Sequence, residues 1–355
     1  MARVCHGVGM DFELLSELTE TSGVPGYEDR IREIVSRELS PVADRVQTDA
    51  MGNLVATVEG ERDYEVVVAA HMDEIGFMVR YVHEDGFLEI DPLGGWDPRV
   101  VKAQRVTVHT DGGDLPGVIG SPPPHTMDEA DLEEKDEVED HYVDVGLPVA
   151  EVQERVSVGD PVTMCQSTTR IGDNVAGKAL DDRICLYALV EAAKRAAPAV
   201  TVHYVATDQE EVGLRGARAL GVDLDPDLAV ALDVTVANDI PQFLQEGDYV
   251  TSLGEGTAIK IKDGSVLTNP KVHRRMRQVA EDEGISHQLE VLPSGGTDTA
   301  GFQLEGGAKP VGAISIPTRY LHTVTESANV ADLDATVDLL VAFLESETGE
   351  FDYRL

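Results

Sequence analysis

Four apolar segments of this chain run into side chains that can bind metal ions, and each segment is short enough to be a buried strand. The segments are 66–70, followed by His71; 200–207, followed by Glu210 and Glu211; 228–232, followed by Asp233; and 311–316, which leads through a turn to His322. In open α/β sheets, ligands bind outside the carboxyl ends of the strands. Four such ends predict one shared site, although each residue taken alone has an ordinary structural explanation.

Helical patterns alternate with these strands. Two helices are expected within residues 12–39, separated by a turn at 25–27, and further helices at 183–197 and 269–283. Residues 287–292 read as another strand. Near the end of the chain, Leu333, Val337, Leu340, Val341 and Leu344 share one helical face. The alternation predicts an α/β fold, with a layered sheet covered by helices on both faces.

The sequence pattern changes between residues 76 and 167, where short β-like runs are separated by Gly and Pro. We interpret this stretch as an inserted small β module. Inside it, the acidic run at 128–140 is expected to be a solvated, mobile loop without a catalytic role.

Charge excludes several classes of partner. The 66 acidic residues against 28 basic ones give a formal net charge of −38, which would repel nucleic acid and anionic membranes. We interpret the excess as adaptation to high salt and expect a halophilic archaeal source, because salt screens self-repulsion while hydrated carboxylates maintain solubility. A merely acidic cytosolic protein is the alternative.

Three scattered cysteines, Cys5, Cys165 and Cys185, do not suggest a disulfide framework or a thiolate metal site. The first ten residues lack a signal-peptide pattern, and no apolar stretch approaches the length of a membrane span. A cytoplasmic protein is therefore expected.

The strand at 66–70 ends in His71-Met72-Asp73. Residues i and i+2 of an extended chain point to the same side, so the Asp73 carboxylate can meet the His71 ring and fix its tautomer. A histidine at a strand end is more often structural, and this motif alone predicts a metal site only weakly.

Two adjacent carboxylates, Asp181 and Asp182, precede the helix predicted at 183–197. N-capping is the ordinary explanation. One of the pair can cap while the other points elsewhere, and a carboxylate can bridge two cations held about 3.5–4 Å apart.

Glu210 and Glu211 are also adjacent, so their side chains face different directions. One can bind metal while the other takes a proton from a metal-bound water. A glycosidase-like acid/base pair fits less well, because those carboxyls must face each other across the scissile bond. A charged turn is the remaining alternative.

Several motifs together resemble the M42 metallopeptidases, the tetrahedral aminopeptidases of archaea and bacteria. They are AHMDEIG at 70–76, GGWDP at 94–98, PGVIG at 116–120, KALDDR at 178–183, EEVG at 210–213, GGTD at 295–298 and PTRYLH at 317–322. The resemblance covers nearly the whole chain. One departure is Thr257, where proline is expected, in a segment that would border the substrate pocket.

The resemblance implies a site with two divalent ions, Zn²⁺ or Co²⁺. His71, Asp181 and Asp233 would bind one ion, and Asp181, Glu211 and His322 the other. Glu210 would be the general base that activates a metal-bridging hydroxide, and Asp73 would orient His71.

The resemblance also implies the architecture. A three-layer mixed-sheet catalytic domain at 1–75 and 168–355 would be interrupted by a PDZ-like β-barrel at 76–167 that serves oligomerisation. Such chains form dimers that assemble into a tetrahedral homododecamer. The implied activity is removal of N-terminal residues from peptides in the cytosol.

Two other functions remain open. A dinuclear carboxypeptidase or N-acyl deacylase would use the same ions on a similar sheet. A non-catalytic scaffold would bind peptides through the inserted module, with a vestigial metal site.

Overall fold

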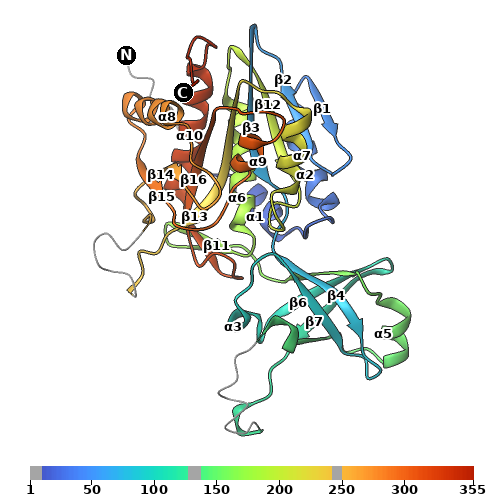
Figure 1. Ribbon diagram of the computed structural model, residues 1–355. Helices are drawn as coiled ribbons and strands as arrows, with labels where there is room; N and C mark the ends of the chain where they lie inside the picture. Colours follow the sequence, from blue (N-terminus) through green and yellow to red (C-terminus); the bar gives the residue numbers. More distant parts are fainter. Residues whose placement is uncertain (1–9, 127–136, 242–249) are drawn as a thin grey trace.

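The computed structural model describes residues 10–126, 137–241 and 250–355, which form a large layered body joined to a small β-barrel (Figure 1). In the body, the described residues form an eleven-stranded mixed sheet of order β1-β2-β12-β3-β13-β16-β17-β11-β10, with β14 pairing β16 and β15 pairing β14. The strands are β1 (Arg45–Thr48), β2 (Leu54–Val58), β3 (Arg62–His71), β10 (Thr169–Ile171), β11 (Asn174–Gly177), β12 (Val200–Thr207), β13 (Leu228–Val236), β14 (Thr257–Lys262), β15 (His287–Val291), β16 (Val311–Arg319) and β17 (Glu326–Asn329).

Side chains of the central strand β3 alternate between two hydrophobic clusters. Val66, Val68 and Ala70 join a cluster that includes residues of α1, α2, α6, α8 and α10, whereas Val67 and Ala69 join one that includes α7 and α9. Because successive side chains of a strand point to opposite faces, helices cover both faces, and the predicted three-layer α/β fold is confirmed. The helices are α1 (Phe12–Glu20), α2 (Asp29–Leu39), α6 (Leu180–Arg195), α7 (Arg215–Asp223), α8 (Pro270–Glu283), α9 (Thr299–Leu304) and α10 (Val330–Ser346).

The neighbouring strands β12, β3, β13 and β16 are parallel. Their carboxyl ends therefore meet at one edge of the sheet, as the four apolar segments predict. The predicted end of the strand at 228–232 is wrong, because β13 stays paired with β16 as far as Val236. Asp233 consequently lies inside a strand rather than after it.

The inserted module is a closed barrel of order β4-β5-β8-β7-β6-β9. Its core includes Phe77, Leu88, Val106 and Val162. The elements are β4 (Gly76–Val82), β5 (Leu88–Leu93), α3 (Pro98–Val101), β6 (Arg105–Thr110), β7 (Gly113–Ile119), η1 (Pro124–Thr126), η2 (Val138–Asp140), β8 (Tyr142–Asp144), α5 (Val149–Arg155) and β9 (Pro161–Met164). The expected small β-barrel is confirmed, while its limits at 76 and 167 and its role in oligomerisation stay predictions.

Polar contacts join the barrel to the body. Arg30 donates to both carboxylate oxygens of Asp114 at 2.7 Å, and the Tyr27 hydroxyl donates to the carbonyl of Gly159 at 3.0 Å. Residues 128–136, most of the acidic run predicted as a loop at 128–140, lie outside the described residues, and residues 138–140 form the short helix η2 rather than a loop. Among the residues that are described, none of the helices combines the length and apolar character needed to cross a membrane.

Candidate metal centre

His71 is the last residue of β3, and its ring is held by the chain just beyond it. Nδ1 donates to the backbone carbonyl of Asp73 at 3.0 Å, and Nε2 lies 3.1 Å from Asp181 Oδ1. A hydrogen bond at one ring nitrogen fixes which nitrogen is free to bind a metal. His71 therefore presents Nε2 to the carboxylates of the site.

Asp73 lies where the sequence predicts, but its carboxylate has a different main contact. Asp73 Oδ1 is 3.5 Å from His71 Nδ1, whereas its two oxygens accept the backbone N–H groups of Glu210 and Glu211, each at 2.9 Å. The backbone carbonyl of Asp73 thus orients the imidazole, and its side chain fixes the turn that carries the two glutamates.

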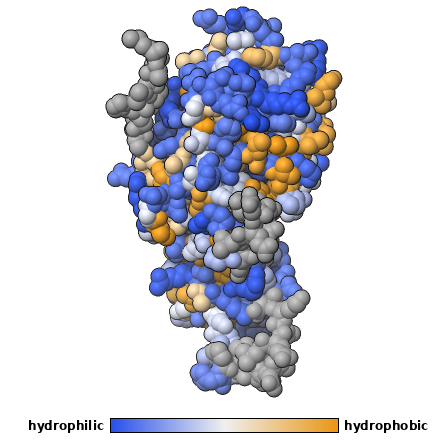
Figure 2. All heavy atoms as spheres, turned by 90° about the vertical axis from the view of Figure 1, so that its left-hand side faces the viewer, coloured by the Kyte–Doolittle hydropathy of each residue, from blue (hydrophilic) through white to orange (hydrophobic). Residues whose placement is uncertain are grey.

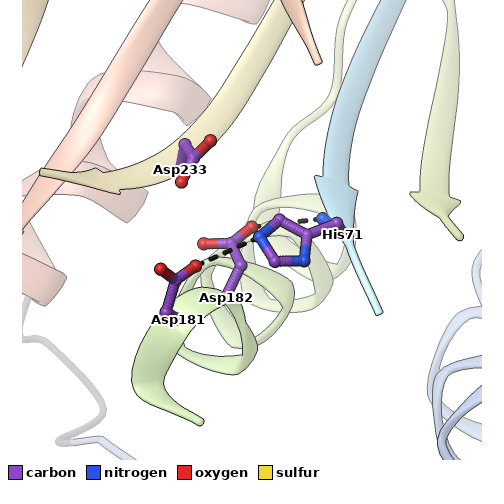
Figure 3. Close-up of side chains that lie close together, drawn as sticks. All are labelled: His71, Asp181, Asp182 and Asp233. Carbon is purple, nitrogen blue, oxygen red and sulfur yellow. Dashed lines mark hydrogen bonds and ion pairs between the residues drawn. The ribbon is translucent and has the colours of Figure 1, made fainter. Parts of the chain in front are cut away.

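Asp181 and Asp182 begin α6, and neither caps it through its side chain. Asp181 lies between two imidazoles, with Oδ1 3.1 Å from His71 Nε2 and Oδ2 3.4 Å from His322 Nε2. Asp182 instead accepts the backbone N–H of His71 at 3.1 Å. Figure 3 shows both carboxylates directed from the helix toward His71, with Asp233 approaching from β13. The capping explanation of this pair is therefore wrong.

Glu210 and Glu211 follow β12 and lie in different surroundings. Glu211 Oε2 is 3.7 Å from His322 Nε2, and its Oε1 is buried without a hydrogen-bond partner. Glu210 Oε2 is 4.0 Å from His71 Nε2.

His322 follows β16 in a left-handed backbone conformation, with φ 59°. Its Nδ1 donates at 2.7 Å to the carbonyl of Gly95, in the segment between β5 and α3. The inserted module therefore orients one imidazole of the site, and Nε2 is left facing Asp181 and Glu211.

The ligand atoms form two overlapping groups, each with its atoms within 4.8 Å of one another. One contains His71, Asp181, Asp182 and Asp233, and the other Asp181, Glu211 and His322. Imidazole nitrogen and carboxylate oxygen suit Zn²⁺ and related divalent ions, and the unpartnered Glu211 Oε1 and Asp182 Oδ1 are buried acceptors that a cation would satisfy. The residues present thus fit two ions that share Asp181.

Burial and mutual repulsion raise the pKa values of most carboxyl groups in the site, whereas for Asp181 the hydrogen bonds with His322 and His71 outweigh burial and lower the pKa. Burial, reinforced by the charge of Asp181, raises the pKa of Glu211 to about 8. Burial also raises the pKa of Glu210 and of Asp233 well above their ordinary values. For His322, burial opposes protonation, but the hydrogen bond to Asp181 and the charge of Glu211 raise its pKa to about 10. Without cations, the raised pKa values of Glu210, Glu211 and Asp233 favour the protonated, neutral forms of these carboxyl groups.

Removal of divalent ions should make thermal stability depend more steeply on pH. A carboxyl group such as Glu211, whose pKa is raised on folding, stabilises the fold most below its unfolded value of 4.5, and this contribution is lost as pH rises through about 8. Bound cations favour the ionised form and oppose this loss. We expect the melting temperature in chelator to fall between about pH 5 and 9 more than it does with Zn²⁺; parallel curves would contradict this account.

The ligand groups open into a cavity of about 590 Å³. Its walls include Val234 and Val236 of β13, Leu292, and Lys260 of β14. Lys260 is buried, with Nζ 3.0 Å from Glu290 Oε1 and 3.4 Å from Asp263 Oδ2. The cavity is therefore lined by the carboxylates of the site together with apolar side chains.

Sequence reasoning did not single out Asp182 as a group facing the site, nor Lys260, which lines the cavity. It also missed Asp298, which accepts a hydrogen bond from the Thr207 hydroxyl at the end of β12, and Glu326, which accepts the backbone N–H groups of Asp181 and His322. The acidic doublet was a signal for Asp182, and Asp298 is part of the matched GGTD motif. The alternation of Ile and Lys at 259–262 was a signal for a strand at Lys260, but a lone glutamate such as Glu326 has no sequence signature.

Two basic side chains, those of Lys178 and Arg319, lie beside ligand motifs in the sequence but form ion pairs with carboxylates outside the two ligand groups. Lys178 is buried and donates to Glu74 at 2.6 Å, and Arg319 donates to both oxygens of Asp239 at 2.7 Å. Both side chains are therefore held in salt bridges.

Comparisons with known proteins agree with this geometry. A family model described as M42 glutamyl aminopeptidase matches residues 52–339. The lysyl aminopeptidase of Pyrococcus furiosus is 38% identical over 343 residues, which span 95% of this chain and 97% of the relative.

Solved structures show the same similarity. An aminopeptidase from the archaeon Desulfurococcus kamchatkensis has a TM-score of 0.91 and 35% identity, with 95% of each chain covered. The TET1 peptidase of Pyrococcus horikoshii, which can assemble into a tetrahedron or a large octahedral shell, has a TM-score of 0.86 and 34% identity over 94% of this chain and 99% of that one. The similarity thus includes the barrel as well as the layered body.

Proposed function

The chain belongs to the M42 peptidase family of metallo-aminopeptidases, and we propose that it removes single N-terminal residues from peptides with two divalent ions and Glu210 as general base. The observation that carries the proposal is Asp181, which belongs to both ligand groups and lines the cavity. We assign His71, Asp181 and Asp233 to one ion and Asp181, Glu211 and His322 to the other.

The two ions, Zn²⁺ or Co²⁺, would supply polarisation of the scissile carbonyl and acidification of the attacking water. The protein would contribute a proton carrier. Glu210 lines the cavity and reaches to 4.0 Å from His71 Nε2, yet it belongs to neither ligand group. Its carboxylate is therefore free to accept a proton from the attacking water and to return it to the leaving amine.

The acidic lining of the cavity also supports the proposed requirement for a free N-terminus. Five carboxylates, those of Asp181, Asp182, Glu210, Glu211 and Asp233, surround the two imidazoles. Part of this charge can attract the α-ammonium group of a peptide. An N-acylated peptide lacks that cation and would not be held with its first peptide bond at Glu210.

A panel of aminoacyl chromogenic substrates tests the activity. We expect hydrolysis of free-amine substrates in the presence of Zn²⁺ or Co²⁺, loss of hydrolysis in chelator, and little hydrolysis of the N-acetylated counterparts. Preferential cleavage of the N-acylated substrates would favour a deacylase, and release of C-terminal residues a carboxypeptidase. The panel should include lysyl and glutamyl substrates, because the matched relative is a lysyl aminopeptidase and the matched family model describes a glutamyl aminopeptidase.

The charge of the chain determines the assay conditions. Figure 2 shows hydrophilic side chains over most of one face, and the formal net charge is −38. We propose a halophilic, cytoplasmic enzyme, because at about 1 M salt the screening length falls to about 3 Å and self-repulsion is strongly reduced. The panel should therefore be measured in molar salt.

We also propose that the chain assembles through dimers into a tetrahedral homododecamer, in which the barrel contributes to subunit contacts. The similarity to the Pyrococcus horikoshii TET1 peptidase supports this assembly.

A further inference from the structure

We propose that Glu326 is a positioning residue that holds two ligand-bearing segments of the backbone in register, an inference that rests on the two-ion function proposed above. Glu326 is the first residue of β17, which pairs with both β16 and β11. The chain beyond β16 carries His322, and the chain beyond β11 carries Asp181. β17 therefore lies between the two segments that must meet at the second ion.

Both oxygens of the Glu326 carboxylate are used in this position. Oε2 accepts the backbone N–H of Asp181 at 3.0 Å, and Oε1 accepts the backbone N–H of His322 at 2.8 Å. Backbone N–H groups at the start of a helix have no acceptor within the helix, and His322 lies beyond the paired part of β16. The Glu326 side chain thus accepts hydrogen bonds from two backbone N–H groups that have no acceptor within a helix or a strand.

Burial makes this arrangement specific. Glu326 is 1% exposed, and a buried carboxylate is tolerated only when its oxygens are hydrogen-bonded. If either amide moved away, one oxygen would lose its partner inside the protein. The carboxylate therefore resists changes in the separation of the two segments.

That separation governs the second ligand group. Asp181 Oδ2 and His322 Nε2 are 3.4 Å apart, and Glu211 Oε2 is 3.7 Å from the same nitrogen. The ring of His322 is oriented by the carbonyl of Gly95, as described above, but that contact does not fix the distance between its backbone and α6. Glu326 supplies this constraint, and groups that orient metal ligands typically alter metal affinity by about 10- to 100-fold when they are replaced.

The chain offers a matched control in Asp332. This carboxylate is likewise buried, and its two oxygens accept the backbone N–H groups of Gly254 and Gly256, both at 2.8 Å. It contacts no member of the two ligand groups through these bonds. Asp332 thus reproduces the same bonding arrangement away from the metal centre.

The test compares Glu326→Gln with Asp332→Asn in the full-length protein. Each amide side chain keeps one oxygen acceptor and replaces the other with an NH₂ group that cannot accept a backbone N–H. Zn²⁺ affinity is measured by competition with a chelator, and the visible absorption of the Co²⁺-loaded protein reports ligand geometry. We expect Zn²⁺ affinity to fall by about 10- to 100-fold and the Co²⁺ spectrum to change for Glu326→Gln, while Asp332→Asn stays at wild-type values.

Unchanged affinity of Glu326→Gln, or an equal fall in both variants, would overturn the inference and leave the two-ion function standing. Wild-type protein that binds no Zn²⁺ would overturn both. Hydrogen exchange of the metal-free wild-type protein provides a second test, which does not depend on whether a variant folds. Slow exchange is expected at the backbone amides of Asp181 and His322. Rapid exchange at both amides would refute the role of Glu326.

Discussion

Replacement of Glu210 by Gln should lower the turnover number by about 10²- to 10⁴-fold while both metal ions remain bound. Glutamine has nearly the shape of glutamate but cannot accept a proton at catalytic pH. Glu210 lies in neither ligand group, so its loss as a base should not change metal content. Metal analysis of the purified variant and steady-state kinetics with a free-amine substrate provide the two measurements.

An exposed glutamate gives the control for this experiment. Glu283, the last residue of α8, is on the surface, and Glu283→Gln removes the same charge without touching the cavity. We expect wild-type kinetics and wild-type metal content for this variant. If Glu210→Gln retained its turnover, the base would have to be reassigned, and if it lost an ion, Glu210 would have to be counted as a ligand.

Replacement of Asp181 by Asn should instead remove metal. Asp181 is shared by the two ligand groups, and a neutral amide offers one oxygen where the carboxylate offers two charged ones. Both ions should bind more weakly, by more than the roughly 10- to 100-fold typical of residues that only orient ligands. The measurement is Zn²⁺ content per chain after dialysis against chelator, together with residual hydrolysis.

Asp182→Asn is the informative companion variant. Asp182 lies within ligand distance of the first group, but one of its oxygens accepts the His71 backbone N–H at 3.1 Å. Asparagine can still accept that bond, so this variant should keep both ions if Asp182 only supports His71. Wild-type metal content in Asp181→Asn, or loss of an ion in Asp182→Asn, would require a different assignment of the ligands.

The sheet was predictable wherever a strand is buried on both faces. Segments 66–70, 200–207, 228–232 and 311–316 all lie within observed strands, because such strands have continuous apolar runs. Other elements were not identified from the sequence. The helices α7 and α9 are short, and β14 and β17 contain polar residues that are buried only because neighbouring elements cover them. No local sequence pattern indicates that these polar residues are buried.

For the site, the sequence by itself determined which chemistry is available and at which edge of the sheet it gathers. The apolar segments predict buried strands whose carboxyl ends bring His71, Glu210, Glu211, Asp233 and His322 to one edge of the sheet. This much follows from local periodicity and from the direction of the chain, whereas the place of Asp181 in the site was implied by the resemblance to the family.

Only the tertiary structure decided how neighbouring groups divide their tasks. It places Asp181 between the two imidazoles and directs Asp182 to the backbone of His71. It also brings Gly95 of the inserted module to His322, and Glu326 to the two ligand-bearing segments. The reason is physical: apart from the contact of Glu326 with His322, these contacts join residues 110 to 227 positions apart in the chain. Their geometry is therefore set by the packing of whole elements, which no local sequence pattern specifies.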